Sequence, residues 1–120
     1  MCYQIRRVTG KWLDTINELQ KVCLPSDKRS DVSVGRWWLV FHDGTPVAFA
    51  GWQPSTSWLH TAYLCRCGVI PSHRGSGLQK RLIRVRCNDA RRQGCDWVIT
   101  DTRQNPASAN SLISCGFKMY

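Results

Sequence analysis

Two segments of the chain repeat apolar residues every three or four positions, the spacing of an amphipathic helix. They cover residues 11–23 and 78–93. The apolar positions of the first are Trp12, Leu13, Ile16, Leu19 and Val22. In the second, we expect one face to turn inward, with Leu78, Leu82, Val85 and Ala90, and the other outward, with Lys80, Arg81, Arg84 and Arg91. Pro25 and Gly94 end the two predicted helices.

Other segments are rich in β-branched and aromatic residues, which is typical of strands. They cover residues 2–8, 36–42, 47–52, 58–70 and 97–100. Asp43 and Gly44 form a hairpin signal between the second and third segments, so these two strands should be antiparallel neighbours. A last helix is predicted from Asn105 to residue 115, and Phe117 begins a further predicted strand.

This order of strands and helices predicts a single α/β domain over residues 1–120, with one mixed sheet and crossover helices. The length suits one hydrophobic core. No apolar run approaches the ~18 residues of a membrane span, and the first residues do not read as a signal peptide. We therefore expect a cytoplasmic protein that does not enter a membrane.

The chain has seven cysteines, an odd number, which favours reduced thiols over a disulfide framework. Cys65 and Cys67 lack the two-residue spacer of common zinc sites, and no histidine pair stands at metal-ligand spacing, so no metal is expected. On a strand, these two cysteines should point to the same face as small buried hydrophobic residues.

The chain is basic, with 17 Lys and Arg against 8 Asp and Glu and a net charge of +9. Such a charge attracts acidic ligands and raises their rate of encounter. Nucleic acid is one such ligand, which the outward arginines of the predicted helix over 78–93 could bind together with nearby aromatic residues. A solvated basic surface is the alternative, and charge alone does not separate the two.

The segment from Val69 to Leu78 passes from a strand through Pro71 and a glycine-rich turn into the second helix. Backbone N–H groups of such a turn point into one concavity, and the helix dipole adds positive potential. Gly75 and Gly77 allow positive φ and let a ligand approach the backbone. The turn is therefore predicted to bind a phosphate.

The same turn resembles the acyl-coenzyme A signature of the GNAT superfamily of N-acetyltransferases, Arg/Gln-x-x-Gly-x-Gly/Ala. This chain has Arg74 and Gly77 in that pattern and departs from it at Gln79. A second match lies downstream, where Asn105 opens an Asn-x-x-Ala/Ser helix and Gly116-Phe117 closes it. The resemblance implies a mixed, mostly antiparallel sheet flanked by helices, with splayed central strands and, in this chain, missing or short C-terminal strands.

The resemblance also implies acetyl-CoA as co-substrate, without a metal. The backbone of Cys67 and Val69 would hold the pantetheine arm, and the Asn105 side chain would reach it from the opposite wall. The pyrophosphate would bind the turn, through the amides of Arg74, Gly75, Ser76, Gly77, Leu78 and Gln79.

The two motifs do not assign the acid and the base that transfer protons. Leu112 stands where the family commonly has a tyrosine acid, so that role does not carry over. Ser108 is our candidate acid on the same helix, beside the alternatives Ser111 and Cys115. His60 and Asp101 are the candidate bases, because Glu18 is the only glutamate and lies on the first helix, and a chain of waters is the alternative.

The leading hypothesis is acetyl transfer to a primary amine of an unidentified acceptor. The alternatives are an inactive acyl-CoA-binding protein, a basic nucleic-acid-binding domain, and an acetyltransferase acting on an RNA-linked acceptor. Four tryptophans are candidates for an acceptor pocket or for the core: Trp37, Trp38, Trp52 and Trp58. Because few residues follow Gly116, we expect either a truncated chain or a homodimer that covers the sheet edge.

Overall fold

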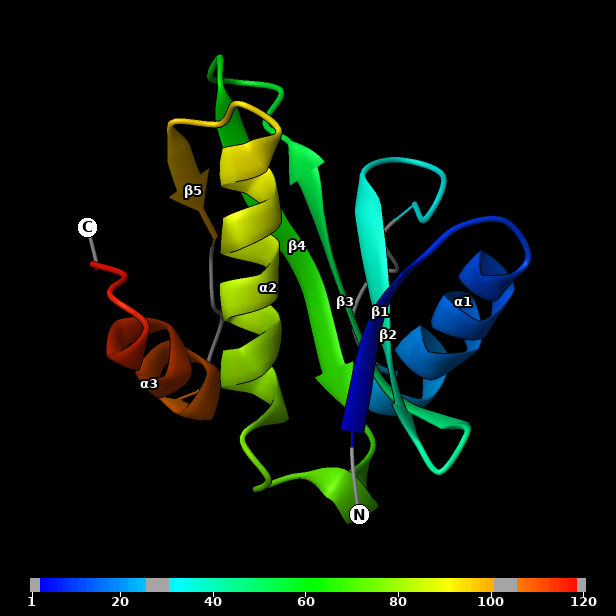
Figure 1. Cartoon of the computed structure of the whole chain (residues 1–120). Coiled ribbons are helices and arrows are strands. Elements are labelled where there is room, and N and C mark those ends of the chain that lie inside the picture. Colours follow the sequence, from blue (N-terminus) through cyan, green and yellow to red (C-terminus); the bar gives the residue numbers. More distant parts are fainter. Residues whose placement is uncertain (1–2, 26–30, 101–105, 119–120) are drawn as a thin grey trace.

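The computed structural model describes residues 3–25, 31–100 and 106–118, and only the backbone of 106–109. Figure 1 shows its elements, which are β1 (Tyr3–Val8), α1 (Trp12–Cys23), β2 (Arg36–His42), β3 (Thr45–Pro54), β4 (Thr61–Val69), the 3₁₀ helix η1 (Pro71–His73), α2 (Leu78–Arg92), β5 (Trp97–Ile99) and α3 (Pro106–Ser114). The strands form one sheet in the order β1-β2-β3-β4-β5. Within the described part of the chain, this confirms the predicted mixed α/β fold.

Neighbouring strands are antiparallel except β4 and β5, which are parallel. The predicted hairpin is confirmed, because His42 pairs with Thr45 and the turn consists of Asp43 and Gly44 alone. Both turn residues have positive φ, 50° and 79°, as a tight hairpin between twisted strands requires. β3 therefore begins earlier than the predicted residue 47.

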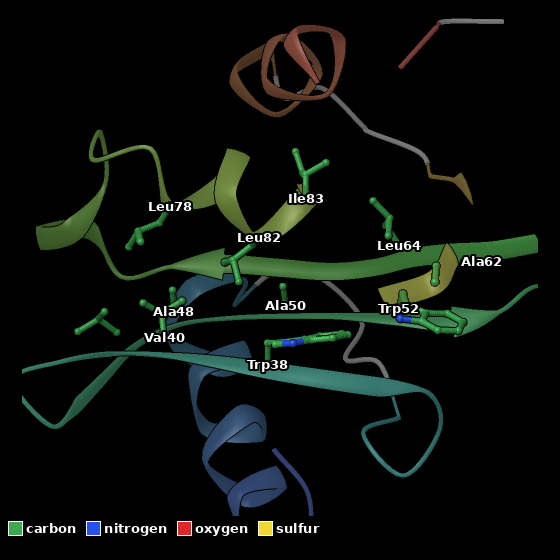
Figure 2. Packing of buried hydrophobic residues seen from close by; sticks show 12 residues of the cluster. Trp38, Val40, Ala48, Ala50, Trp52, Ala62, Leu64, Leu78, Leu82 and Ile83 are labelled. Atoms are coloured by element: carbon green, nitrogen blue, oxygen red, sulfur yellow. The ribbon is translucent and has the colours of Figure 1, made fainter. Parts of the chain in front are cut away.

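The two faces of the sheet carry separate hydrophobic clusters, and a different helix covers each face. The cluster under α1 contains Val8, Ile16, Leu19, Cys23, Trp37, Leu39, Phe49 and Cys65. The cluster under α2 is shown in Figure 2, where Leu78, Leu82 and Ile83 of α2 lie over Ala48 and Ala50 of β3. Burial of these apolar side chains is the main stabilising contribution to the fold.

Two strand glycines leave room for aromatic rings of the cluster under α1, and Gly68 also leaves room for α1 itself, because a Cβ there would lie 2.7 Å from Cys23 Cβ. A Cβ on Gly51 would lie 2.4 Å from the Trp37 ring, and one on Gly68 would lie 2.6 Å from the Phe49 ring. The helix is present as predicted, but not all of its apolar positions are buried, since Trp12 is 43% exposed and Val22 61% exposed. The buried face is rotated toward positions 16, 19, 20 and 23.

The helix α2 buries polar residues as well as apolar ones. Its predicted outward residues are exposed, but Arg86 and Asp89 are buried and Val85 is only half-buried. Asp89 accepts hydrogen bonds from Arg36 Nε at 2.6 Å and from Trp52 Nε1 at 2.9 Å. The ion pair replaces the water that the carboxylate loses on burial.

A β-bulge in β4 overturns the prediction for its two cysteines. Arg66 pairs with Gly51 and Leu64 with Trp52, so Cys65 is an extra residue between them. One extra residue shifts the alternation of side chains by one position. Cys65 therefore lies in the cluster under α1, and Cys67 packs on the opposite face, against the cluster under α2.

Two predicted strand segments are shorter or absent. Residues 58–60 precede β4 as an exposed turn, where His60 has a φ of 53°. Residues 117 and 118, which end the described part, form no strand. Instead the Phe117 N–H donates to Leu112 O at 3.1 Å and the Gly116 N–H to Ile113 O at 3.0 Å, which closes α3 with a Schellman motif.

Among the described residues, no helix has the length and apolar character needed to cross a membrane.

Candidate functional site

The site begins where β4 and β5 separate. Their pairing runs from Thr61 with Trp97 to Tyr63 with Ile99 and no further. The Thr100 hydroxyl then donates to Leu64 O at 2.9 Å. Beyond this contact, no described strand pairs with the β5 side of β4, although β4 continues to Val69. This end of the described pairing is consistent with the splay between central strands that the resemblance implied.

The backbone groups of Cys67 and Val69 point toward this splay. The Ile70 N–H donates to Val47 O at 3.0 Å, so Ile70 belongs to the set of residues that bond to β3. Backbone groups alternate along an antiparallel pair, and the neighbouring residue Val69 therefore faces the other side, as does Cys67. The Val69 carbonyl accepts a hydrogen bond from Arg74 Nε at 3.0 Å.

The chain leaves β4 through η1 and enters the glycine turn, at the bottom of Figure 1. Gly75 and Gly77 have φ values of 82° and 79°, so both occupy the left-handed region that favours glycine. The Ser76 hydroxyl donates to His73 O at 2.6 Å and holds the turn together. Gly77 is also the N-cap residue of α2.

The amides of this turn are available to a ligand. Within the described residues, the structure gives no intramolecular acceptor for the N–H groups of Gly75, Ser76, Gly77 and Leu78. A Cβ built on either glycine would meet nothing within 4 Å, so the space beside the turn is open. Because α2 directs its positive dipole end at the same point, the turn can bind an anion.

One of the six amides predicted to bind the pyrophosphate already has an acceptor within the protein. The Arg74 N–H donates to Pro71 O at 3.3 Å, so its amide differs from those of the four residues that follow. Its side chain is exposed and folds back onto β4 rather than over the turn. Gln79 lies in the first turn of α2 and is half-buried.

The thiols beside the splay are poor nucleophiles. Burial raises the pKa of Cys65 to about 11, an effect that the nearby Arg86 only partly offsets. Burial also raises the pKa of Cys67, again against the influence of Arg86. Since the thiolate is the reactive form, neither cysteine is suited to carry an acyl group. All six described cysteines are free.

The proposed proton-transfer residues are not brought together in the described structure. Asp101 and the pantetheine candidate Asn105 lie outside the described residues. Ser108 lies on α3, but its side chain is not described. His60 is exposed, and the nine residues of β4, at about 3.3 Å each, separate it from the glycine turn. These assignments stay predictions.

Three of the four tryptophans considered for an acceptor pocket belong to the core. Trp37, Trp38 and Trp52 are buried, and Trp52 is bonded to Asp89. Trp58 is 63% exposed and lies in the turn before β4. Only Trp58 of these four is therefore open to a ligand in this structure.

A ring cluster beside the turn was not found from the sequence. The Tyr3 hydroxyl lies 2.9 Å from His73 Nδ1, and the His42 and His73 ring centroids are 4.8 Å apart. The cluster attaches η1 to β1 and β2. Its members are distant in the sequence, and the only signal was the position of His73 next to the turn.

Comparison with known proteins identifies the family. The model of the acetyltransferase (GNAT) family matches residues 5–117 of the chain, which includes β4, the glycine turn and α2. No curated protein matches the chain.

Solved structures show the same fold at low sequence identity. The aminoglycoside N-acetyltransferase AAC(6')-Iy, in complex with the bisubstrate analogue CoA-S-monomethyl-acetylneamine, has a TM-score of 0.85 and 20% identity over 99% of this chain and 92% of that chain. IAA acetyltransferase from Bacillus cereus has a TM-score of 0.84 and 18% identity over 99% and 79%. The ribosomal-protein-S18-alanine N-acetyltransferase from Escherichia coli has a TM-score of 0.81 and 18% identity over 98% and 78%.

Proposed function

Because the chain belongs to the acetyltransferase (GNAT) family, we propose that it transfers an acetyl group from acetyl-CoA to a primary amine of an acceptor. The observation that carries this proposal is the turn over Gly75, Ser76, Gly77 and Leu78. Its amides are available, and it joins the splayed end of β4 to the positive end of α2. Such a turn suits a pyrophosphate, and the open side of β4 suits the arm attached to it.

The donor would bind along both features at once. The pyrophosphate accepts hydrogen bonds from the amides between Gly75 and Gln79, and the pantetheine amides pair with Cys67 and Val69 as an added strand would. Pairing with Val69 replaces the present contact of Arg74 with its carbonyl. The released guanidinium can then bind the phosphates, which ties Arg74 to the donor. Asn105 is proposed to bind the pantetheine from the other side.

The reaction is an attack of the amine nitrogen on the thioester carbonyl carbon. A C–N bond forms, the C–S bond breaks, and the coenzyme A thiolate leaves and takes up a proton. A strand N–H near Val69 polarises the carbonyl oxygen. Correct orientation of the two reactants contributes about 7–11 kcal/mol to lowering the barrier. An alkyl ammonium group with a pKa of about 10.4 must first lose a proton, so a base or bridging water is needed.

His60 and Asp101 remain our candidate bases and Ser108 our candidate acid. Because Leu112 occupies the position of the usual tyrosine, an acyl-CoA-binding protein without catalysis is the second candidate function. The identity of the acceptor is not part of this proposal. The proteins of similar structure include an aminoglycoside N-acetyltransferase and a ribosomal-protein-S18-alanine N-acetyltransferase, and both names imply amine acceptors.

We add three proposals on location, assembly and acceptor charge. Free cysteines fit a reducing cytoplasm, so we place the protein there. A homodimer would cover the outer edge of β5, and light scattering would measure it. The basic surface would favour an acidic or RNA-linked acceptor, and a steep loss of nucleic-acid affinity with salt would support that choice.

The proposal is tested first by melting the protein with and without acetyl-CoA. We expect a stabilising shift that saturates with the ligand and is lost in Gly77→Trp, which fills the open space beside the turn, and in Arg74→Glu. Absence of a shift at millimolar acetyl-CoA would refute donor binding. Thiol release across a panel of polyamines, aminoglycosides, amino acids and peptide N-termini then separates an active enzyme from a protein that only binds the donor.

A further inference from the structure

The bulge in β4 lies at the point where the proposed donor site begins. Leu64, on one side of the extra residue Cys65, holds the last described contact with the β5 segment through Thr100. On the other side, the chain continues to Cys67 and Val69, whose backbone faces the splay. If Cys65 were instead paired as an ordinary strand residue, the alternation counted from Leu64 would turn the backbone groups of Cys67 and Val69 toward β3. The direction of the donor-binding amides therefore depends on the bulge.

Arg86 of α2 reaches this bulge from a buried position. Its side chain is only 3% exposed, and its Nη1 donates to Gly51 O at 3.0 Å. The same nitrogen makes a longer contact of 3.5 Å with Arg66 O. Gly51 and Arg66 are the paired residues that border the bulge on β3 and β4. One guanidinium group thus contacts both strands at the place where their register changes.

The hydrogen-bond partners of the buried Arg86 guanidinium are unusual for a charged group. Arg86 Nε donates to Leu82 O at 3.2 Å, and no carboxylate among the described residues forms an ion pair with it. By contrast, Arg36 binds the carboxylate of Asp89 through two nitrogens, one helical turn further along α2. A buried guanidinium without a carboxylate is costly to keep, and an apolar side chain would serve packing alone. The contacts of Arg86 with the sheet are to the carbonyls of Gly51 and Arg66, the two residues that border the bulge.

We infer that Arg86 is a positioning residue, which fixes the β4 bulge and thereby aims the Cys67 and Val69 backbone at the pantetheine arm of the donor. The inference rests on the proposed function for its effect on ligand binding, but not for its effect on the strand. Arg86 touches no reacting atom in this scheme. It acts through the two carbonyls that it holds.

The strand effect is measured in the free protein by amide hydrogen exchange. Arg86→Met keeps an unbranched side chain and removes the donors, and Arg86→Lys keeps one cationic donor. In Arg86→Met we expect faster exchange and altered amide shifts between Leu64 and Val69, with Arg86→Lys closer to wild type. Unchanged shifts and exchange in this segment would overturn the inference.

The binding effect is measured with two probes, acetyl-CoA and 3′-phospho-ADP, which keeps the pyrophosphate but lacks the pantetheine. Misplaced strand amides should weaken acetyl-CoA binding by about ten- to a hundredfold in Arg86→Met. Binding of 3′-phospho-ADP to the turn should be unchanged. A general loss of stability would weaken both ligands together, so the ratio of the two affinities reports positioning.

Arg36→Met is the matched control, because it removes a buried contact of α2 with the sheet but no contact with the bulge carbonyls. We expect it to lower the melting temperature and leave the affinity ratio at the wild-type value. An Arg36→Met variant with the same change of ratio as Arg86→Met would overturn the inference. If the wild-type protein binds neither probe, the proposed function fails, and amide exchange alone then decides the role of Arg86.

Discussion

The two faces of the sheet hold their helices by different means. Under α1 the contacts with the sheet are mainly apolar: Ile16 and Phe49 are fully buried, Gly68 leaves room for close packing, and the buried Gln20 donates to Asn17 Oδ1 of the same helix at 3.3 Å. Under α2 the apolar cluster is crossed by buried polar groups, the Arg36–Asp89 ion pair and the Arg86 guanidinium. Apolar contacts stabilise without direction, whereas hydrogen bonds fix particular atoms in particular places.

This difference matches the position of the candidate site. The glycine turn and α2 form one continuous segment, and any shift of α2 against the sheet would move the turn relative to β4. The helix α1 has no part in the turn. We therefore expect changes on the α1 face to alter stability alone, and loss of the Arg86 contacts on the α2 face to alter donor binding as well.

The largest effect should come from Ile16→Ala on the α1 face. Ile16 is completely buried, and its truncation should lower the free energy of unfolding by about 2–5 kcal/mol, through lost burial and a cavity. Urea denaturation measures the loss. Because α1 has no part in the turn, the acetyl-CoA affinity of the folded variant should stay near that of wild type. A large loss of affinity would contradict the difference between the two faces.

A smaller effect is expected from Cys65, which lies in the same cluster. Its pKa rises from an ordinary value of 9.0 to about 11 in the folded protein. The unfolded chain therefore loses this proton at lower pH, so the stabilisation is complete below pH 9 and is lost as the pH rises toward 11. The loss should reach about 2–3 kcal/mol.

The measurement compares wild type with Cys65→Ala in urea denaturation across this pH window. Other titrating groups contribute to both proteins, so the difference between them isolates Cys65. The wild type should lose its advantage as the pH rises. A difference that does not depend on pH would contradict the assigned burial of this thiol.

The smallest effect is expected in the turn itself, from Ser76→Ala. The lost hydrogen bond to His73 O is exposed, so the melting temperature should not change measurably. A less ordered turn should weaken acetyl-CoA binding by about two- to threefold, equivalent to about 0.5 kcal/mol. Isothermal titration calorimetry measures the acetyl-CoA affinity. A loss of stability without a change of affinity would show that the turn supports the fold and does not bind the donor.

Elements with strong local signals were predictable from the sequence. The bounds of β2 match the prediction, because its aromatic and β-branched run ends at the Asp43-Gly44 turn. The end of α2 was predicted from Gly94, which has a φ of 92° there. The glycine turn was likewise readable, because positive φ at Gly75 and Gly77 is a property of the local chain.

Features that depend on distant partners were not predictable. The bulge at Cys65 arises from the pairing of β4 with β3, and no residue type within β4 predicts it. The buried positions of Arg86 and Asp89 break the apolar periodicity of α2, and Asp89 finds its partner Arg36 53 residues away. The contact between Tyr3 and His73 spans 70 residues. Proton transfer stays a prediction, because its candidates are undescribed or lie far from the turn.

Binding of the donor by the turn after β4 can be observed residue by residue in a titration of the ¹⁵N-labelled protein with acetyl-CoA. We predict the largest saturable amide shifts at Gly75, Ser76 and Gly77, with smaller shifts at Cys67 and Val69. The amide resonances of α1 should not shift. Saturable shifts that leave the turn unchanged, or no shifts at millimolar acetyl-CoA, would contradict the account.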